Sequence, residues 1–460
     1  VFILGLFWKR ANSTGSFAAL MTGFFFAVFL LISKALDLVP FLNEIHFLHM
    51  TAYLTILCAA VHVAVSLATP APDHAQIQPY IYTKEFFDED TNMVSQEIRL
   101  VSPQFDKFDW VAGIYYYDGS ASTDRYSQLL GGVLEVHLPS RVDTTSYAAY
   151  VHGNYRFFEE LELTLGLRYT SEEKEIDYAQ TTTLAVLGAA NGELVSDSKD
   201  SDVSPSIGLN WSFSNDAMLF VRYAKAYKSG GWNADFNLSS GAGFNDDFMQ
   251  YDQESVDAYE LGLKSTWLES SLQLNATLFR SEFTDFHVQD FSTLQYTNAA
   301  EAVSQGVEIE FTYIPTDRVK LTLNSTYLDS SFEDYNLGGV DLAGAGLPYA
   351  PEWKTYAGVQ YIQPVGDGGE LTFNLDYTYT GEQYSDPRET STDFLDNYDV
   401  WNARVTFNPS SDQWQVAAWI KNAEDSDYYT QASRAFTGAP RGVLGAPQTY
   451  GVSFSYFLGN

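Results

Sequence analysis

The side chains that come nearest to a metal-binding set lie in one acidic segment of the chain. Asp246, Asp247 and Asp252 are close together in sequence, and carboxylate oxygens are the ligands that Ca²⁺ and Mg²⁺ prefer. Their spacing does not match the ligand positions of an EF-hand loop, so a solvated acidic loop is the better interpretation. The Asp- and Ser-rich run at residues 196–202 has the same interpretation. No catalytic arrangement stands out, and the sequence therefore predicts no enzyme, no cofactor and no metal site.

Aromatic side chains form a second group that could contact a ligand. They lie in or beside a polar segment at residues 229–253 and are Tyr227, Trp232, Phe236 and Tyr251. Flat aromatic rings can stack on a planar ligand such as a sugar ring, and their amphipathic character also suits a boundary between membrane and water. We rank the boundary role above the ligand role, so these four residues are candidates for ligand contact only.

The elements that would position these side chains are β-strands with two unlike faces. In the segment YELGLKSTW, Leu261 and Leu263 alternate with Glu260 and Lys264. Strict alternation predicts a strand with one apolar and one polar face. Only residues 268–270 separate this run from the next one, which predicts a tight hairpin.

The same alternation recurs along most of the chain after residue 76, with charged residues on the polar faces. Such charges would be costly in lipid, so the polar faces are expected to line a water-filled lumen. The charges that we assign to the lumen are Glu162, Arg168, Glu260, Glu308, Glu310 and Arg404. We count about fifteen or sixteen strands, joined alternately by short turns and long loops. The long, outward-facing loops predicted are residues 118–141, 171–202, 229–253, 329–352 and 381–397.

The composition narrows the class of protein. Aromatic residues make up 16% of the 460 residues, and the formal net charge is −34. A strongly acidic chain is a poor nucleic-acid binder. Regular alternation and abundant aromatic rings argue against disorder. The single cysteine, Cys58, rules out an intrachain disulfide.

Membrane β-barrels combine these properties, because their apolar residues face lipid and aromatic girdles mark the two interfaces. The fold class that we predict is mainly β: a partial transmembrane antiparallel β-barrel, preceded by two transmembrane α-helices. The helices follow from two runs without Asp, Glu, Lys or Arg, at residues 11–33 and 45–72. As a helix, the first run would be about 35 Å long, which is enough to cross a bilayer.

Residues 1–73 resemble the late transmembrane helices of sodium/solute symporters. The resemblance is carried by GLFWKRANSTGSFAALMTG and by FLHMTAYLTILCAAVHVAVSLATPAPD. In that family, sodium and substrate are bound on helices that would precede this segment, so no such site is transferred here. His62, inside the second apolar run, is interpreted as a packed neutral imidazole or an interfacial one.

Residues 94–457 resemble the carboxy-terminal barrel of TonB-dependent outer-membrane receptors. The motifs that carry the resemblance, in chain order, are SQEIRLVSP with DWVAGIYYY, VRYAKAYKSGGWN, YELGLKSTWL, TNAAEAVSQGVEIE, LPYAPEW and WIKNAEDSDYY. Each motif is weak by itself, but the order and spacing of the whole set are specific to the family.

This second resemblance implies a barrel of about 22 strands that is plugged by an amino-terminal domain. It also implies uptake of a siderophore, cobalamin or an oligosaccharide, driven through TonB. The partners implied are membrane lipid or lipopolysaccharide, the TonB complex, and a small iron-chelate or glycan ligand, with no nucleic acid. The plug, the TonB box and the first several strands of the family pattern are missing, so we expect a truncated barrel.

The two resemblances assign the chain to two different membranes of a Gram-negative cell. A barrel belongs in the outer membrane, whereas apolar helices would target the inner membrane. We therefore expect a chimeric chain, with a symporter-like tail at residues 1–73 joined to a receptor-like barrel at residues 77–460. Two alternatives remain open: a fragment of a sodium-coupled symporter, and a surface all-β adhesin.

Overall fold

The computed structural model describes residues 13–36, 47–69, 87–103, 105–129, 134–183, 191–236, 244–290, 295–411, 413–434 and 440–457. The chain divides into two compact units, Val1–Asp88 with Asp124–Ser127, and Glu89–Thr123 with Gln128–Asn460. The junction that the sequence predicts between residues 73 and 77 lies outside the described residues.

The amino-terminal unit contains two helices, α2 (Ser13–Leu36) and α4 (Phe47–Ala68). They pack closely where Gly23 faces Cys58, because a Cβ atom on Gly23 would lie only 3.2 Å from Cys58 Sγ. His62 is fully buried, and its Nε2 lies 3.4 Å from Ser16 Oγ on the other helix. The expected packed imidazole is therefore present, held between two helices.

One prediction for this unit needs correction. Both apolar runs form helices, but no helix within the described part of the chain is long and apolar enough to cross a membrane. The interpretation of α2 and α4 as transmembrane helices is therefore not supported.

The second unit is built on one antiparallel sheet of 15 strands, in which neighbours in sequence are neighbours in space. Its strands are β1 (Phe87–Val101), β2 (Phe108–Leu129), β3 (Leu134–Phe158), β4 (Leu161–Thr182), β5 (Gly192–Ser214), β6 (Ala217–Lys228), β9 (Glu254–Trp267), β10 (Leu272–Asp290), β11 (Gln295–Thr316), β12 (Val319–Asp334), β15 (Trp353–Pro364), β16 (Gly369–Thr380), β19 (Tyr398–Pro409), β20 (Trp414–Lys421) and β23 (Thr449–Tyr456). The prediction of a mainly β chain with about fifteen strands is confirmed.

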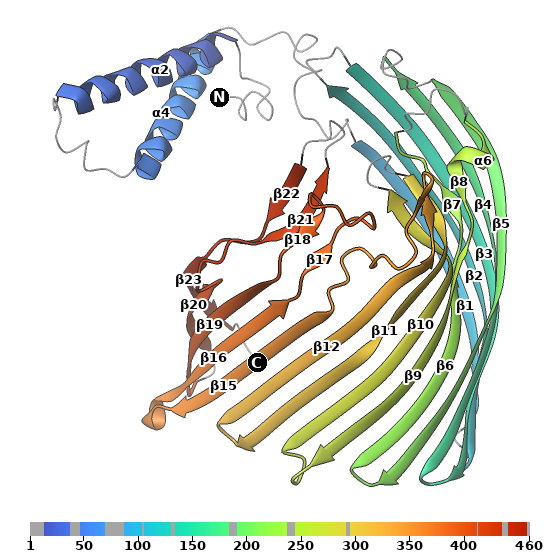
Figure 1. Ribbon diagram of the computed structural model, residues 1–460. Coiled ribbons are helices and arrows are strands. Elements are labelled where there is room, and N and C mark those ends of the chain that lie inside the picture. Colours follow the sequence, from blue (N-terminus) through green and yellow to red (C-terminus); the bar gives the residue numbers. More distant parts are fainter. Residues whose placement is uncertain are drawn as a thin grey trace. The chain divides into compact units, whose positions relative to one another are not determined.

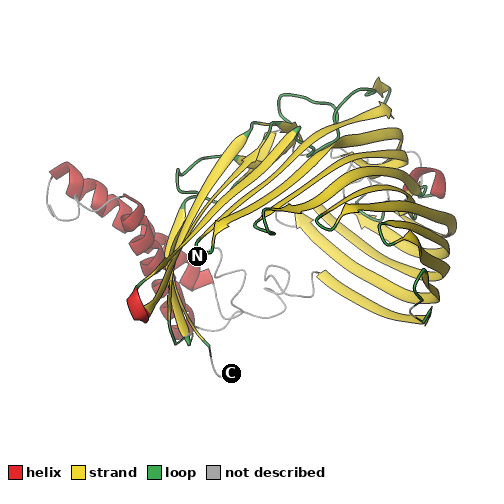
Figure 2. Ribbon diagram, turned by 90° about the horizontal axis from the view of Figure 1, so that it is seen from below, coloured by secondary structure: helices red, strands yellow, loops and turns green. Residues whose placement is uncertain are grey.

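The sheet is curved, and its strands run side by side in chain order (Figures 1 and 2). Within the described residues, β1 and β23 are its two edges. Smaller elements lie in the connections: β7 (Gly231–Trp232), β8 (Gln250–Tyr251), β13 (Asn336–Leu337), β14 (Val340–Asp341), β17 (Gln383–Tyr384), β18 (Phe394–Leu395), β21 (Tyr429–Arg434), β22 (Pro440–Leu444), the short helix α6 (Asp246–Met249) and the 3-10 helix η5 (Gly366–Gly368).

The hairpin between β9 and β10 has the tight turn that the sequence predicts. Trp267 pairs with Leu272 across it. Leu268, Glu269 and Ser270 all have left-handed backbone angles, with φ of 52°, 56° and 68°. Such angles are uncommon outside glycine, so this turn is conformationally strained.

The two faces of the sheet differ as the alternation predicts. Leu261 on β9 pairs with Leu278 on β10, which in turn pairs with Val307 on β11. On the opposite face the corresponding row is Gly262, Thr277 and Glu308. Leu261 is 47% exposed and Leu278 is 51% exposed. The apolar face is therefore uncovered, which is the reverse of a soluble sheet that packs its apolar face against a core.

Paired aromatic rings border this apolar face at both ends of the strands. Near the short turns, Trp211 contacts Phe213, and Tyr361 stacks on Phe373. Near the long connections, Tyr223 contacts Tyr259, and Tyr327 contacts Trp353. On β15, Trp353 and Tyr361 stand ~27 Å apart by the rise of a strand. Strands of membrane barrels are tilted by about 35–45°, so this separation corresponds to a height of ~20 Å, close to the lipid-facing band of about 25 Å.

Buried apolar side chains instead gather beside the long connections, in two clusters. The first, which we call the Trp232 cluster, contains Val136, Leu138, Ile176, Tyr178, Leu194, Trp232 and Met249. The second contains Val288, Ala299, Ala302, Phe332, Tyr335 and Leu342. These two small cores pack the long connections and strand ends together.

The segments at residues 118–141 and 171–202, which we predict as loops, are largely strand. In the first, β2 continues to Leu129 and β3 starts at Leu134. The second is largely a strand pair. β4 continues to Thr182 and β5 starts at Gly192, with Ser171 paired to Ser201 and Gln180 paired to Gly192. The pairing extends this far because alternation persists within the polar sequence. Its apolar members Ile176 and Leu194 are buried in the Trp232 cluster.

Candidate functional site

Charged side chains on the polar face of β2, β3 and β4 form one connected network. Arg156 pairs with Asp109, and Arg156 Nε lies 3.2 Å from Glu162 Oε2. The Asn154 side-chain N–H donates to Asp109 Oδ1 over 2.9 Å, and Thr164 Oγ1 donates to Asn154 Oδ1 over 3.0 Å. The charged side chains are 31–36% exposed, so each pair contributes little to stability. Their main effect is to fix where the charges lie.

Arg168, the next predicted charge on β4, lies between aromatic rings. Its guanidinium carbon is 5.7 Å from the ring centre of Tyr115 and 5.8 Å from that of Tyr150. The Tyr150 hydroxyl donates to Glu97 Oε1 over 2.8 Å, and Glu97 also pairs with Arg99. A cation between ring faces is held by the negative charge of the ring faces. The network of β2 to β4 thus continues to β1.

The remaining predicted charges lie further along the same face. Glu260 is opposite Arg222 on β6, and Glu308 is opposite Thr277 on β10. Glu310 accepts a hydrogen bond from Asn275 Nδ2 over 3.0 Å, and Arg404 Nε donates to Thr406 Oγ1 over 3.2 Å. Following the paired residues across the sheet places all six predicted charges on the face opposite to Leu261. That these residues line a lumen stays a prediction.

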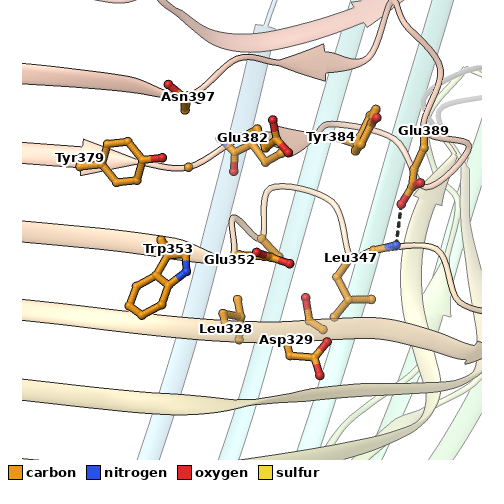
Figure 3. A pocket seen from close by; sticks show the side chains of 15 residues that line it. Leu328, Asp329, Leu347, Glu352, Trp353, Tyr379, Glu382, Tyr384, Glu389 and Asn397 are labelled. Carbon is orange, nitrogen blue, oxygen red and sulfur yellow. Dashed lines mark hydrogen bonds between the residues drawn. The ribbon is translucent and has the colours of Figure 1, made fainter.

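A pocket of about 520 Å³ lies at the loop-side ends of β12, β15 and β16 (Figure 3). We call it the loop-end pocket. Its acidic and aromatic lining residues are Asp329, Glu352, Glu382, Glu389, Trp353, Tyr379 and Tyr384. Carboxylates accept hydrogen bonds from hydroxyl and ammonium groups, and aromatic rings supply flat apolar contact. The pocket therefore suits a ligand that is rich in hydroxyl or cationic groups and carries a planar part.

Hydrogen bonds hold two walls of this pocket together. Glu389 Oε1 accepts the backbone N–H of Gly346 over 2.7 Å, which joins two connections that are far apart in sequence (Figure 3). The backbone N–H of Tyr349 donates to the carbonyl of Tyr384 over 2.8 Å. Asp329 Oδ2 accepts from Gln305 Nε2 over 3.0 Å. The lining is therefore shaped before any ligand arrives, which limits the entropy lost on binding.

The four aromatic residues singled out from the sequence are mostly part of the packing of the long connections. Trp232 is only 8% exposed and donates its indole N–H to Asp246 Oδ1 over 3.1 Å. Phe236 packs against the Trp232 cluster. The Tyr251 ring centre lies 4.9 Å from that of His287, and burial raises the pKa of Tyr251. Tyr227 is partly buried near the end of β6. Contact of any of the four with a ligand stays a prediction.

The acidic residues singled out from the sequence have different structural roles. Asp246 begins α6 and accepts from Ser196 Oγ over 2.7 Å as well as from Trp232. The backbone N–H of Asp252 donates to Asn298 Oδ1 over 2.9 Å. In the part of the chain that the structure describes, no group of three or more His, Cys, Asp or Glu residues is placed to hold a metal ion.

Sequence reasoning did not identify the loop-end pocket, because its lining comes from segments that are far apart in the chain. The motif LPYAPEW was a usable signal, since it supplies Leu347, Ala350, Glu352 and Trp353 to the lining. The carboxylates Glu382 and Glu389 carry no such signal, because they belong to a polar connection that resembles any solvated loop.

Comparisons with known proteins agree with this architecture. The family model described as TonB dependent receptor-like, beta-barrel, matches residues 59–423. The TonB-dependent siderophore receptor PiuA of Acinetobacter baumannii is 25% identical over 307 residues, which cover 63% of this chain and 38% of PiuA. The crystal structure of the ferric yersiniabactin uptake receptor FyuA from Yersinia pestis superposes with a TM-score of 0.68 at 18% identity. That superposition covers 80% of this chain and 54% of FyuA, so the chain spans about half the length of these relatives or less.

A different relative matches a short part of the chain. The sodium/mannose cotransporter SLC5A10 of Bos taurus is 40% identical over 88 residues, which cover 17% of this chain and 15% of the cotransporter. A match of that extent does not establish a family. The model match to the receptor barrel covers most of the chain, and the sheet has the corresponding fold. The chain therefore belongs to the TonB dependent receptor-like β-barrel family.

Proposed function

We propose that this chain contributes the barrel of a TonB-dependent outer-membrane receptor that takes up a ferric siderophore. The observation that carries the proposal is the inverted sheet, with an exposed apolar face bordered by aromatic pairs and a charged opposite face. A membrane around the sheet would stabilise that arrangement, because lipid covers the apolar face while water hydrates the charged one. The siderophore class is supported by relatives such as PiuA and FyuA, whose names refer to siderophores or to ferric yersiniabactin. Cobalamin and oligosaccharides remain the alternative ligand classes.

The charged face would then line the water-filled side of the barrel, where Arg156, Glu162 and Arg168 stay hydrated. The proposed partners are lipid or lipopolysaccharide on the apolar face, the TonB complex on the periplasmic side, and the iron chelate. The long connections would face outward. The loop-end pocket lies among them and would make one contact with the ligand, through its carboxylates and the Tyr384 ring.

The membrane part of the proposal is tested by folding the full chain in detergent micelles and in aqueous buffer. We expect a compact form in micelles whose mobility on a denaturing gel changes on heating, because membrane barrels keep their structure until heated. An adhesin would fold in aqueous buffer without detergent. Folding without detergent would therefore contradict the proposal.

The ligand part is tested with a ferric trihydroxamate that carries a free ammonium group as the probe and the iron-free trihydroxamate as the control. We expect the iron complex to bind the micelle-folded chain, and Tyr384→Ala to weaken binding at least tenfold because it removes one wall of the pocket. The matched control is Trp401→Ala, which removes an aromatic ring that pairs with Tyr377 outside the pocket. Equal losses from both substitutions would show that the pocket does not contact the ligand.

We further propose that residues 1–73 are a sodium/solute symporter-like segment joined to the barrel. The short match to the bovine cotransporter supports it. The two compact units are consistent with two origins, without requiring them. Sequencing the source DNA in long reads across codons 60–90 tests the junction. Reads that separate the halves into two genes would support a composite sequence, whereas reads and a junction-spanning peptide in one product would show a single natural chain.

A further inference from the structure

The apolar face of the sheet is not flat, because a groove crosses it over β2 to β6. The groove has a volume of about 660 Å³, and its floor includes Trp110, Val151, Gly153, Leu165 and Ile207. None of the described residues that line it is Asp, Glu, Lys, Arg or His. Apolar clefts of this size are typical of sites for small molecules, and they accept hydrocarbon because nothing in them needs hydration.

The groove exists because one position in the middle of the apolar face, Gly153, lacks a side chain. Gly153 pairs with Leu165, and Leu165 pairs with Ile207. The neighbours of Gly153 on its own strand and face, Val151 and Tyr155, carry large side chains that are 48% and 42% exposed. A Cβ atom on Gly153 would already lie 3.4 Å from the Phe108 ring. A larger side chain there would fill the groove.

We propose that this groove binds one acyl chain of a membrane phospholipid. The inference rests on the proposed function, since it requires the apolar face to meet a bilayer. The groove opens onto the exposed apolar face, between the aromatic pairs at the two ends of the strands. The acyl chain of a neighbouring lipid therefore reaches the groove without leaving the bilayer. Each methylene that moves from the bilayer into the groove gains close contact with fixed side chains.

The two ends of the groove differ, and the difference favours a phospholipid over lipopolysaccharide. Beyond its loop-side end, the Tyr223 hydroxyl donates to Asp257 Oδ1 over 2.6 Å, which places a carboxylate there. A carboxylate at that end repels a headgroup that carries several phosphates. Beyond the turn-side end the border is aromatic, with Tyr155 contacting Phe157. The acyl chain therefore enters from the turn side, where a single phosphate stays outside the groove.

The proposal is tested by fluorescence quenching with a phospholipid whose acyl chain is brominated. The full chain is folded into vesicles in which a rising fraction of the lipid carries bromine, which quenches tryptophan on contact. The signal of Trp110 is the difference between the protein and its Trp110→Phe variant, and the signal of Trp211 is obtained with Trp211→Phe. Trp211 is the matched control, because it is 50% exposed on the same apolar face but does not line the groove.

We expect Trp110 to be quenched at a brominated fraction several times lower than Trp211, and Gly153→Leu to abolish that difference. If Gly153→Leu does not fold, Ile207→Phe, which fills less of the groove, takes its place in the quenching test. Equal quenching of Trp110 and Trp211 in the unsubstituted protein would overturn the groove proposal while leaving the membrane location intact. If neither residue were quenched at any fraction, the proposed membrane location would fail as well. Relief of the Trp110 quenching by added lipopolysaccharide, but not by unbrominated phospholipid, would overturn the choice of phospholipid.

Discussion

Replacing Gly262 by alanine tests whether close contacts between aromatic rings and glycine fix the polar face of the sheet. Gly262 lies on β9 directly opposite Phe220 on β6, and the Phe220 ring covers it. A Cβ atom at Gly262 would lie 2.3 Å from both Cε1 and Cζ of that ring. Real Cβ atoms do not approach ring carbons so closely, so the ring must move from its position, where it also faces Lys264 Nζ at 5.4 Å.

The expected magnitude follows from two opposing terms. Overpacking of this kind costs about 1–3 kcal/mol. Replacing glycine by alanine also lowers the conformational entropy of the unfolded chain, which stabilises the fold by about 0.4–1 kcal/mol. We therefore expect Gly262→Ala to lower the free energy of unfolding by about 1–2 kcal/mol. The measurement is urea unfolding of the micelle-folded chain, followed by tryptophan fluorescence.

Replacing a matched glycine on the same face should change the free energy of unfolding in the opposite direction. A Cβ atom on Gly208 would meet only Thr164 Cβ at 3.6 Å and Val221 O at 3.7 Å, which are ordinary contacts. Gly208→Ala should therefore stabilise the protein by about 0.5 kcal/mol. In a Phe220→Ala background, most of the destabilisation by Gly262→Ala should disappear, because the ring is gone and only the Ala276 carbonyl oxygen, at 3.2 Å, remains close to the new Cβ atom. Equal effects of Gly262→Ala and Gly208→Ala, or a Gly262→Ala effect unchanged by Phe220→Ala, would refute the reasoning.

Three further predictions follow from particular contacts. Glu269→Gly, in the strained turn at φ 56°, should stabilise the fold by about 1 kcal/mol because glycine adopts left-handed angles freely; an unchanged midpoint in urea would argue against strain. Asn298→Ala removes side-chain hydrogen bonds to the backbone of Asp252 and Asp285. Hydrogen exchange of the Asp252 amide should therefore speed up by roughly tenfold or more. Unchanged exchange would show that water replaces the lost hydrogen bonds. Trp232→Ala leaves a cavity in the Trp232 cluster, at a local cost of about 3–5 kcal/mol. We expect residues 229–253 to become sensitive to protease while the heat-dependent gel shift persists. Loss of that shift would mean that the cluster stabilises the whole barrel.

Much of the sheet could be predicted from the sequence because side-chain alternation is a local property of a strand. Leu261 and Glu260 must point to opposite sides wherever that strand lies, so the two faces and the hairpin at residues 268–270 followed directly. The strand number followed from counting such runs. The long segment at residues 171–202 was assigned wrongly because polar residues in a paired strand look like a loop until their partners are known.

The loop-end pocket and the fate of the aromatic candidates could not be predicted in this way. Glu389 and Gly346 meet only because several strands bring their connections together. Trp232 looks like a ligand contact in the sequence, yet it is buried because Val136 and Ile176, from β3 and β4, pack around it. Contacts of this kind depend on register and strand order, which no single segment encodes.

The sequence by itself therefore determined the class of element, the two unlike faces of the sheet and the family, since these depend on patterns within short segments. Tertiary structure alone decided that β4 and β5 continue, past Ile176 and Leu194, into the segment that was expected to be a loop. It also decided that the apolar runs of α2 and α4 pack as neighbouring helices. It also decided that Gly153 opens a groove in the apolar belt. The physical reason is that burial and clefts arise between residues far apart in the chain, whose approach is set by the folded sheet as a whole.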